Sequence, residues 1–163
     1  MEEVKQDVLI RKGNYNDAHF IMALLNEPSF IKHIGDKQVT SEQSAKEYID
    51  NTFIKPLENN IGAYMVTLPD GTPIGMVGLF QRPQLDAPDL GFALLEQYHR
   101  KGLMYDTCEL FLSNYTQRWP HLYAVTSHHN NASFALLNKL GFSQIGEVTL
   151  DGQNEPSRLL RYQ

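Results

Sequence analysis

Apolar residues along the 163-residue chain follow extended and helical spacings in turn. Short extended runs predict strands, and apolar residues three and four positions apart predict amphipathic helices. The pattern predicts strands at 8–11, 63–68, 74–80, 90–95, 122–126, 142–148 and 157–162, and helices at 16–26, from 40 or 41 to about 57, from 103 to about 119, and from about 131 to 140. This order predicts an α/β fold with a mixed sheet of about six to seven strands and about four flanking helices.

Local signals set the expected boundaries of these elements. Asn16 is placed to cap the first helix, and Pro28 lies beyond the end of that helix. The run 90–95 is almost wholly apolar, which predicts a central strand covered on both faces. Gly141 is placed to end the short helix after residue 131. Because the chain contains no repeat, low-complexity tract or long linker, we expect a single domain over residues 1–163.

Composition narrows the classes of function. A formal net charge of −5 and a pI of about 5.6 argue against nucleic-acid binding and suit a cationic partner such as an amine. Cys108 is the single cysteine, so no intrachain disulfide is possible, and its helical position predicts core packing. No metal site is expected, since His128-His129 has no matching ligand set. Without a membrane-length apolar run or a signal-like start at Met1-Glu2-Glu3, we expect a cytoplasmic protein without membrane partners.

A basic, glycine-containing turn at 97–102 links the central apolar strand to the helix that begins near residue 103. The first amides of a helix lack intrahelical partners and carry the positive end of the helix dipole, so such a turn can hold a pyrophosphate. Gly102 would allow close approach of the anion, and Arg100 and Lys101 would add positive charge. A plain strand-to-helix turn with two solvated basic side chains is the alternative, and physical reasoning alone leaves both open.

Three blocks in this sequence resemble the GNAT acetyltransferase superfamily. The turn 97–104 resembles its pyrophosphate loop, Gln/Arg-x-x-Gly-x-Gly/Ala. The block 130–142 resembles the Asn-x-x-Ser and Glu-Lys-Leu-Gly-Phe runs of the branch that includes the ribosomal-protein N-terminal acetyltransferases. The hairpin 70–79 resembles the one that precedes the loop in that branch. The order of elements agrees as well, so the resemblance covers nearly the whole chain.

The resemblance implies transfer of an acetyl group from acetyl-CoA to a primary amine, either a protein N-terminus or a small molecule, without a metal. It implies a monomer or a homodimer. The cofactor-binding residues that it suggests are Leu95, Arg100, Lys101, Gly102, Leu103, Met104, Tyr105, Asn130 and Ser133. The catalytic candidates are Ser133, Asp89 and His128.

Four positions depart from the family pattern. His99, Met104 and Asn138 replace the usual Gln/Arg, Gly/Ala and Glu. A bulky Met104 must point away from the cofactor. Leu137 stands where many members carry a tyrosine that protonates the leaving thiolate, so another group or water must fill that role.

Acetyl transfer to an amine requires a neutral amine, a stabilised oxyanion and a protonated or solvated thiolate. The resemblance suggests that the thioester lies in a splay between strands 74–80 and 90–95, with an oxyanion contact from a free amide at 78–80. Gly75 and Gly78 suit a bulge and a close backbone approach there, or simple sheet packing.

Several side chains are candidates for the proton transfers, each with a simpler alternative. Asp89 is the first candidate base, with strand-end solvation as its alternative, and His128 is a rival base or a solvated loop histidine. Glu96 is a weaker third candidate. Ser133 would protonate the thiolate, or serve as a helix cap, or do both. Asn130 would bind the pantetheine arm or form a cap or turn.

Two other functional classes compete with a catalytic acetyltransferase. Met104, Leu137 and the absence of an obvious base are compatible with a non-catalytic acyl-CoA-binding or sensing domain. A nicotinamide-binding domain is disfavoured, because no Gly-x-Gly-x-x-Gly follows a first strand. The acceptor amine is expected near residues 27–36, where Phe30, Ile31, His33 and Asp36 are candidate lining residues or packing and loop residues.

Overall fold

A computed structural model describes residues 7–162. Met1-Glu2-Glu3, on which the expectation of no signal peptide rests, lies outside them. The described residues form a seven-stranded mixed sheet in the order β1-β2-β3-β4-β5-β7-β6. The strands are β1 (Leu9–Arg11), β2 (Gly62–Thr67), β3 (Pro73–Phe80), β4 (Asp89–Leu94), β5 (Tyr123–Thr126), β6 (Phe142–Val148) and β7 (Ser157–Tyr162).

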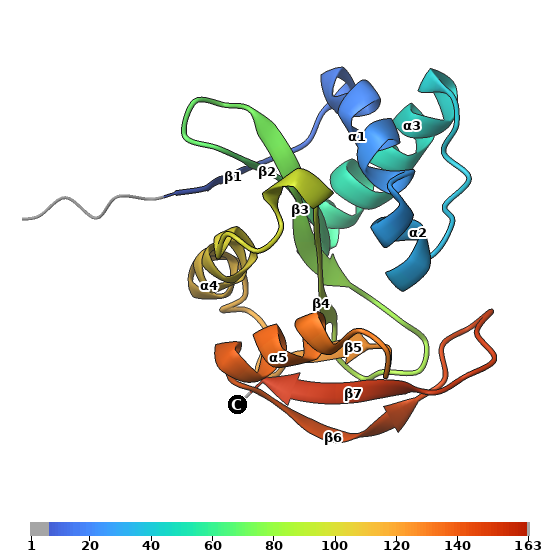
Figure 1. Cartoon of the computed structure of the whole chain (residues 1–163), viewed down its shortest axis with the longest axis vertical. Coiled ribbons are helices and arrows are strands. Elements are labelled where there is room, and N and C mark those ends of the chain that lie inside the picture. Colours follow the sequence, from blue (N-terminus) through green and yellow to red (C-terminus); the bar gives the residue numbers. More distant parts are fainter. Residues whose placement is uncertain (1–6, 163) are drawn as a thin grey trace, which may run out of the picture.

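Five α-helices cover the two faces of this sheet in the described part of the chain (Figure 1). They are α1 (Ala18–Leu25), α2 (Pro28–His33), α3 (Glu42–Ile49), α4 (Leu103–Tyr115) and α5 (Asn131–Leu140). Helices α1 to α3 lie on one face of the β1–β4 half, and α4 lies on the other (Figure 1). The predicted α/β class and mixed sheet are confirmed.

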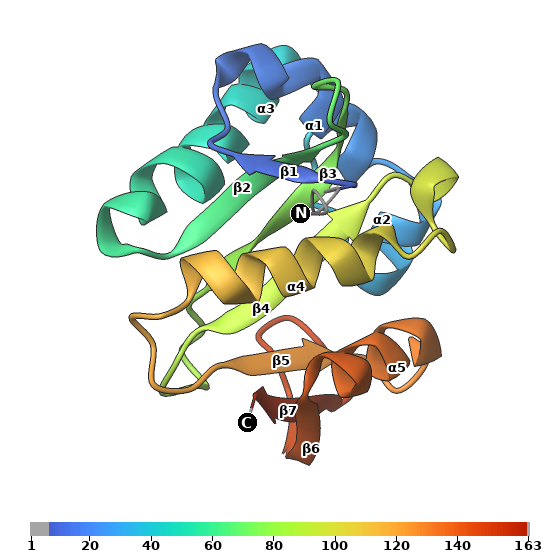
Figure 2. The same ribbon diagram turned by 90° about the vertical axis from the view of Figure 1, so that its left-hand side faces the viewer.

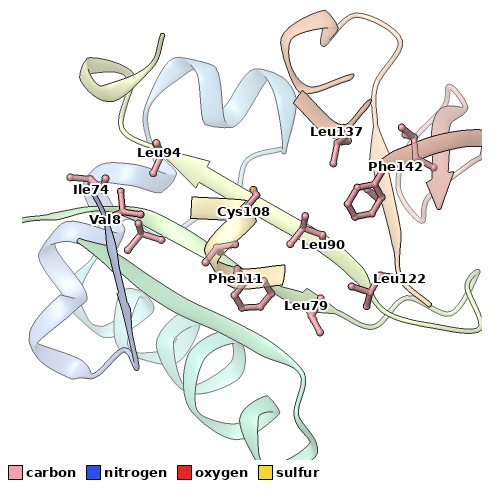
Figure 3. Packing of buried hydrophobic residues seen from close by; sticks show 14 residues of the cluster. Val8, Ile74, Leu79, Leu90, Leu94, Cys108, Phe111, Leu122, Leu137 and Phe142 are labelled. Atoms are coloured by element: carbon pink, nitrogen blue, oxygen red, sulfur yellow. The ribbon is translucent and has the colours of Figure 1, made fainter. Parts of the chain in front are cut away.

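Alternating side chains of the strands build two separate cores. One core lies under α4 and α5 and includes Leu90, Cys108, Phe111 and Leu137 (Figure 3). The other lies under α1 to α3 and includes residues such as Met65 and Ala93. Cys108 is fully buried, as expected, and burial raises the pKa of its thiol, so it stays protonated and unreactive.

The N-terminal helical region differs most from the sequence-based expectation. The predicted helix 16–26 is a 3-10 turn (Tyr15–Asp17) followed by α1, and Asn14 rather than Asn16 is the cap. Asn14 accepts from the backbone N–H of Asn16, and the Asp17 carboxylate accepts from Asn14 N in return. Pro28 does not simply follow a helix end, because it begins α2, where its fixed φ suits the first helical position.

Asp17 is the most heavily bonded carboxylate of this region. It is 6% exposed and accepts from Arg11 Nη1 at 3.0 Å, Arg11 Nη2 at 2.7 Å and Asn14 N at 2.9 Å. Burial opposes its charge, but these donors outweigh burial and hold the pKa of Asp17 below its usual value.

Asp17→Asn is expected to lower the free energy of unfolding by about 1–3 kcal/mol at neutral pH, because Arg11 loses its bidentate partner. A lowered folded-state pKa means that the stabilisation is present above the unfolded pKa and is lost as pH falls through the folded one. Urea unfolding should therefore show the difference between wild type and variant shrinking below about pH 4. A difference that stays constant in acid would contradict this role.

Candidate active site

The central feature of the site is the divergence of β4 and β5. These parallel strands share one ladder pair, Asp89 with Tyr123, and then separate toward their C-terminal ends (Figure 2). By contrast, β3 and β4 pair at six successive positions from Gly75–Leu94 to Phe80–Asp89. The prediction of a splay between β3 and β4 is therefore wrong, and the opening lies one strand further along the sheet.

The expected free amide near Gly78 is also absent from β3, because this strand is paired with β2 and β4 at Gly78. No register shift interrupts the β3–β4 ladder. The irregularity of β3 lies in its pairing with β2, where Val66 pairs with Gly75 and Thr67 with Pro73, so the extra residue is Ile74 beside Gly75. Gly78 instead permits close strand packing, since a Cβ at this position would lie 2.3 Å from the carbonyl oxygen of Gly62. The sheet-packing interpretation of this glycine is the one that the structure supports.

Main-chain groups of β4 line the open side of the divergence. Leu95 N donates to Ile74 O at 2.9 Å, so alternation along β4 directs the N–H groups of Phe92 and Leu94 away from β3. Within residues 7–162, β5 offers no ladder partner to these two positions. A ligand lying along β4 can therefore receive hydrogen bonds from strand amides.

The turn after β4 has the backbone shape of an anion-binding loop. Arg100 has φ of +63° and Gly102 has φ of +76°, both in the left-handed region. Left-handed residues in such a turn direct N–H groups into a concave nest. For Arg100 this conformation is unfavourable by roughly 1–2 kcal/mol, and such strain often marks a functional turn.

The first turn of α4 adds three amides to this nest. Gly102 is the N-cap and has no side chain to accept from them, and no capping hydrogen bond forms in the described structure. Asp106 N makes the first intrahelical bond, to Gly102 O at 3.1 Å, so the amides of residues 103–105 precede it. Nothing lies within 4 Å of where a Gly102 Cβ would be, which leaves room for a ligand. These features fit a pyrophosphate.

Side chains around the turn are arranged so that they leave the nest accessible. Leu103 and Met104 pack against the core under α4, so Met104 points away from the turn, as its position requires. Arg100 and Lys101 are exposed. Lys139, from the last turn of α5, lies 4.4 Å from the ring centre of Tyr105 in the first turn of α4. Two cationic residues thus belong to the turn itself, and a third lies beside the first turn of α4.

His99 supports the turn from within. Its Nε2 lies 2.8 Å from the carbonyl oxygen of Leu94, the last residue of β4. This contact holds the turn against the end of the strand. The family pattern, which has Gln or Arg at this position, did not suggest such a role for His99. The side chain of Leu95, another predicted contact, packs against the core under α1 to α3.

Asn130 and Ser133 were both candidate caps of α5, and Asn130 is the one that caps the helix. Asn130 is the N-cap of α5, and its Oδ1 accepts from Ser133 N at 3.1 Å. Ser133 is therefore not the cap, and its hydroxyl makes no hydrogen bond within residues 7–162. Helical spacing places Ser133 one turn before Leu137, which is 1% exposed in the core, so both lie on the face of α5 turned toward the sheet.

Asp89 lies where β4 and β5 meet, on the sheet face opposite to α4. It is 2% exposed, so the expected strand-end solvation is not found, and its Oδ1 accepts from Arg82 Nε at 2.9 Å. Burial raises the pKa of Asp89 above its usual value, although Arg82 opposes the shift. A buried carboxylate with a raised pKa is a stronger base than an exposed one.

The other two base candidates are engaged elsewhere. His128 Nε2 lies 3.2 Å from Glu147 Oε1 on β6, which is two strands away from β5 in the sheet order, so the ring is directed away from the divergence. The Glu96 carboxylate accepts from the backbone N–H of Ser29. Phe30, predicted to line an acceptor site, is buried in the core under α1 to α3, whereas Ile31 and Asp36 are exposed.

Two further properties of the described residues bear on function. Across residues 7–162, no three His, Cys, Asp or Glu side chains gather closely enough to hold a metal ion. None of the helices there has the length and apolar character needed to span a membrane.

Comparisons with known proteins agree with this geometry. The chain matches a family model described as an acetyltransferase (GNAT) domain over residues 7–143. No curated protein gives a significant match by sequence. The structure of RimL, a ribosomal L7/L12 alpha-N-protein acetyltransferase in complex with coenzyme A, is similar with a TM-score of 0.82 at 15% identity, covering 98% of this chain and 95% of that one.

Two other similar structures come from proteins that are named for, or bound to, different amines. A chimera of the spermidine N-acetyltransferase SpeG from Vibrio cholerae and hSSAT has a TM-score of 0.76 at 17% identity, covering 97% of this chain and 95% of that one. AAC(6′)-Ib in complex with paromomycin and acetyl-CoA has a TM-score of 0.77 at 14% identity, with coverages of 96% and 93%. With the family model spanning most of its length, the chain belongs to the GNAT family of acetyl-CoA-dependent N-acetyltransferases.

Proposed function

We propose that the chain transfers the acetyl group of acetyl-CoA to a primary amine, by direct attack of the amine in the opening between β4 and β5. The observation that carries this proposal is the nest after β4, where a strained Arg100, a left-handed Gly102 and the uncapped start of α4 converge. Amides of residues 103–105 would hold the pyrophosphate, with Arg100, Lys101 and Lys139 supplying charge. The acceptor is a protein N-terminus or a small-molecule amine.

The opening offers different chemistry on its two sides. Bound acetyl-CoA would supply the thioester, and β4 amides such as that of Phe92 are placed to hydrogen-bond its carbonyl oxygen. Ser133, facing the sheet from α5, is positioned to donate a proton to the sulfur as it leaves. Asp89 lies on the opposite sheet face, buried at the closed end of the opening, from which it would take the amine proton through water. Cys108 is buried, so an acetyl-cysteine step has no exposed nucleophile.

A non-catalytic acyl-CoA sensor remains the second candidate because one observation favours it. Leu137 occupies the position of the usual proton-donating tyrosine and is sealed in the core, so it donates nothing. The sensor would bind acetyl-CoA and leave it intact. Both candidates bind acetyl-CoA, so only consumption of acetyl-CoA in the presence of an amine distinguishes the transferase from the sensor.

Acetyl-CoA at 100 times its dissociation constant is expected to stabilise the fold by about 2.7 kcal/mol. Thermal unfolding and calorimetry should both detect this binding. The same protein should then be tested for free-thiol release with peptides, polyamines and aminoglycosides. Thiol release that depends on an amine supports the transferase, and binding without release on every amine supports the sensor. Failure to bind acetyl-CoA by both methods would refute both functions.

Asp89→Asn is expected to flatten the acidic limb of the rate–pH profile, because the proton acceptor is removed. In the wild type, activity should fall as pH drops through the raised pKa of Asp89 and protonates it. Arg82→Lys is the matched control, since it keeps a cation beside the carboxylate. An acidic limb that is unchanged in Asp89→Asn would assign the proton to solvent or to another group.

A further inference from the structure

Two carboxylates tie α2 to the turn after β4. Glu27 Oε1 accepts from the backbone N–H of Glu96 at 2.8 Å, and Glu96 Oε1 accepts from the backbone N–H of Ser29 at 2.9 Å. The bonded residues are 69 and 67 positions apart in the sequence. We call this reciprocal pair the Glu27–Glu96 clasp.

The clasp supplies each segment with the cap that it lacks. Glu27 is the N-cap residue of α2 but makes no side-chain capping bond to its own helix. The 3-10 turn Glu96–Tyr98 is preceded by Leu95, which cannot cap it. Carboxylates stabilise the exposed N–H groups at the start of a helical turn by charge as well as by hydrogen bonding. Consistent with this, the Ser29 N–H lowers the pKa of Glu96.

Packing extends the contact beyond the two hydrogen bonds. Leu95 packs into the core that contains Phe30 of α2. At the other end of α2, burial, Lys32 and the nearby His99 ring together lower the pKa of His33. His99 is itself bonded to the end of β4. Helix α2 is therefore bonded to the turn at its start, and Leu95 packs in the same core as Phe30.

From this arrangement we infer that Glu27 and Glu96 are positioning residues that couple α2, on the acceptor side, to the cofactor turn. The inference rests on the proposed function for the identity of the turn's ligand. When coenzyme A fixes the turn, the amide of Glu96 is fixed too, and the clasp holds the start of α2 in place. Coupling of this kind is reciprocal, so ordering α2 also favours cofactor binding.

Hydrogen–deuterium exchange of the full chain without ligand tests the clasp itself. Glu96→Ala should speed exchange of the α2 amides about three- to tenfold, since a charge-assisted bond is lost. Glu27→Ala should do the same for amides 96–99. The Gln variants should restore slow exchange, because their amide oxygen still accepts. Unchanged α2 exchange in Glu96→Ala would overturn the clasp.

Exchange and calorimetry with coenzyme A test the coupling. In the wild type, coenzyme A should slow exchange in α2, whereas in Glu27→Ala and Glu96→Ala this protection should be lost and the Kd should rise about three- to tenfold. Glu58→Ala, an exposed carboxylate in the 55–59 turn, is the control that should change neither quantity. Wild-type binding without protection of α2 would overturn the coupling. Absence of any coenzyme A binding would refute the proposed function. Hydrogen–deuterium exchange without ligand would still show whether the Glu27–Glu96 clasp exists.

Discussion

Gly102→Val is expected to weaken acetyl-CoA binding by at least about 100-fold, the equivalent of about 3 kcal/mol lost from several amide–phosphate bonds. The valine side chain would occupy the open space beside Gly102, and a β-branched residue is strained at φ of +76°. Both effects move the amides of residues 103–105 away from the anion. Calorimetry with acetyl-CoA measures the loss.

A matched glycine separates local obstruction from general backbone strain. Gly152 has φ of +79° and open space around its Cβ position, but it lies in the β6–β7 loop. Gly152→Val should carry a similar conformational cost and leave binding unchanged. Lys101→Ala should weaken binding only modestly, and more at low salt than at high salt. If Lys101→Ala and Gly102→Val weakened binding equally, recognition by the backbone nest would be wrong.

Ser133→Ala is expected to lower kcat by about 100-fold, the low end of what a positioned acid contributes. The KM for acetyl-CoA should change much less, because the interaction grows as charge develops on the leaving sulfur. The melting temperature should stay close to that of the wild type, since Asn130 and not Ser133 caps α5. Steady-state kinetics with free-thiol detection provides both constants.

Asn130→Ala is the control variant, because it should lower stability, whereas Ser133→Ala should lower kcat. It removes the cap and should lower stability by about 1 kcal/mol. An Asn130 contact with the pantetheine arm would show as a raised KM for acetyl-CoA. Equal stability losses in the two variants, with kcat unchanged in Ser133→Ala, would give Ser133 a structural role alone.

Features that depend on local sequence were predicted well. Strands β6 and β7 have the expected bounds, and Gly141 ends α5 at φ of +107°. The turn at 97–102 was predicted correctly because the residues that indicate it follow one another in the sequence: an apolar strand, basic residues, a glycine and a helix. The candidate amides of residues 103–105 follow from the same local pattern.

Features that depend on distant partners were not predicted. The splay was placed between β3 and β4, because pairing across a sheet is decided by packing of elements far apart in sequence. Helix α2 escaped notice because six residues carry little periodicity and its start is stabilised by Glu96, 67 positions away. The cap of α5 is a local feature that was predicted only as an alternative: Asn130 and Ser133 were both candidates, and composition does not distinguish which of the two has the cap geometry.

The nest after β4 and the open side of β4 present main-chain amides, which every residue except proline possesses. A site of this kind constrains the path of the backbone far more than the identity of its side chains. Substitution can then proceed through most of the sequence during evolution as long as that path survives. This accounts for structures that superpose with TM-scores of 0.76 to 0.82 while sharing only 14 to 17% of their residues. If the nest holds the acyl donor as proposed, substitutions in the loops can change the acceptor while the main-chain contacts to the donor persist.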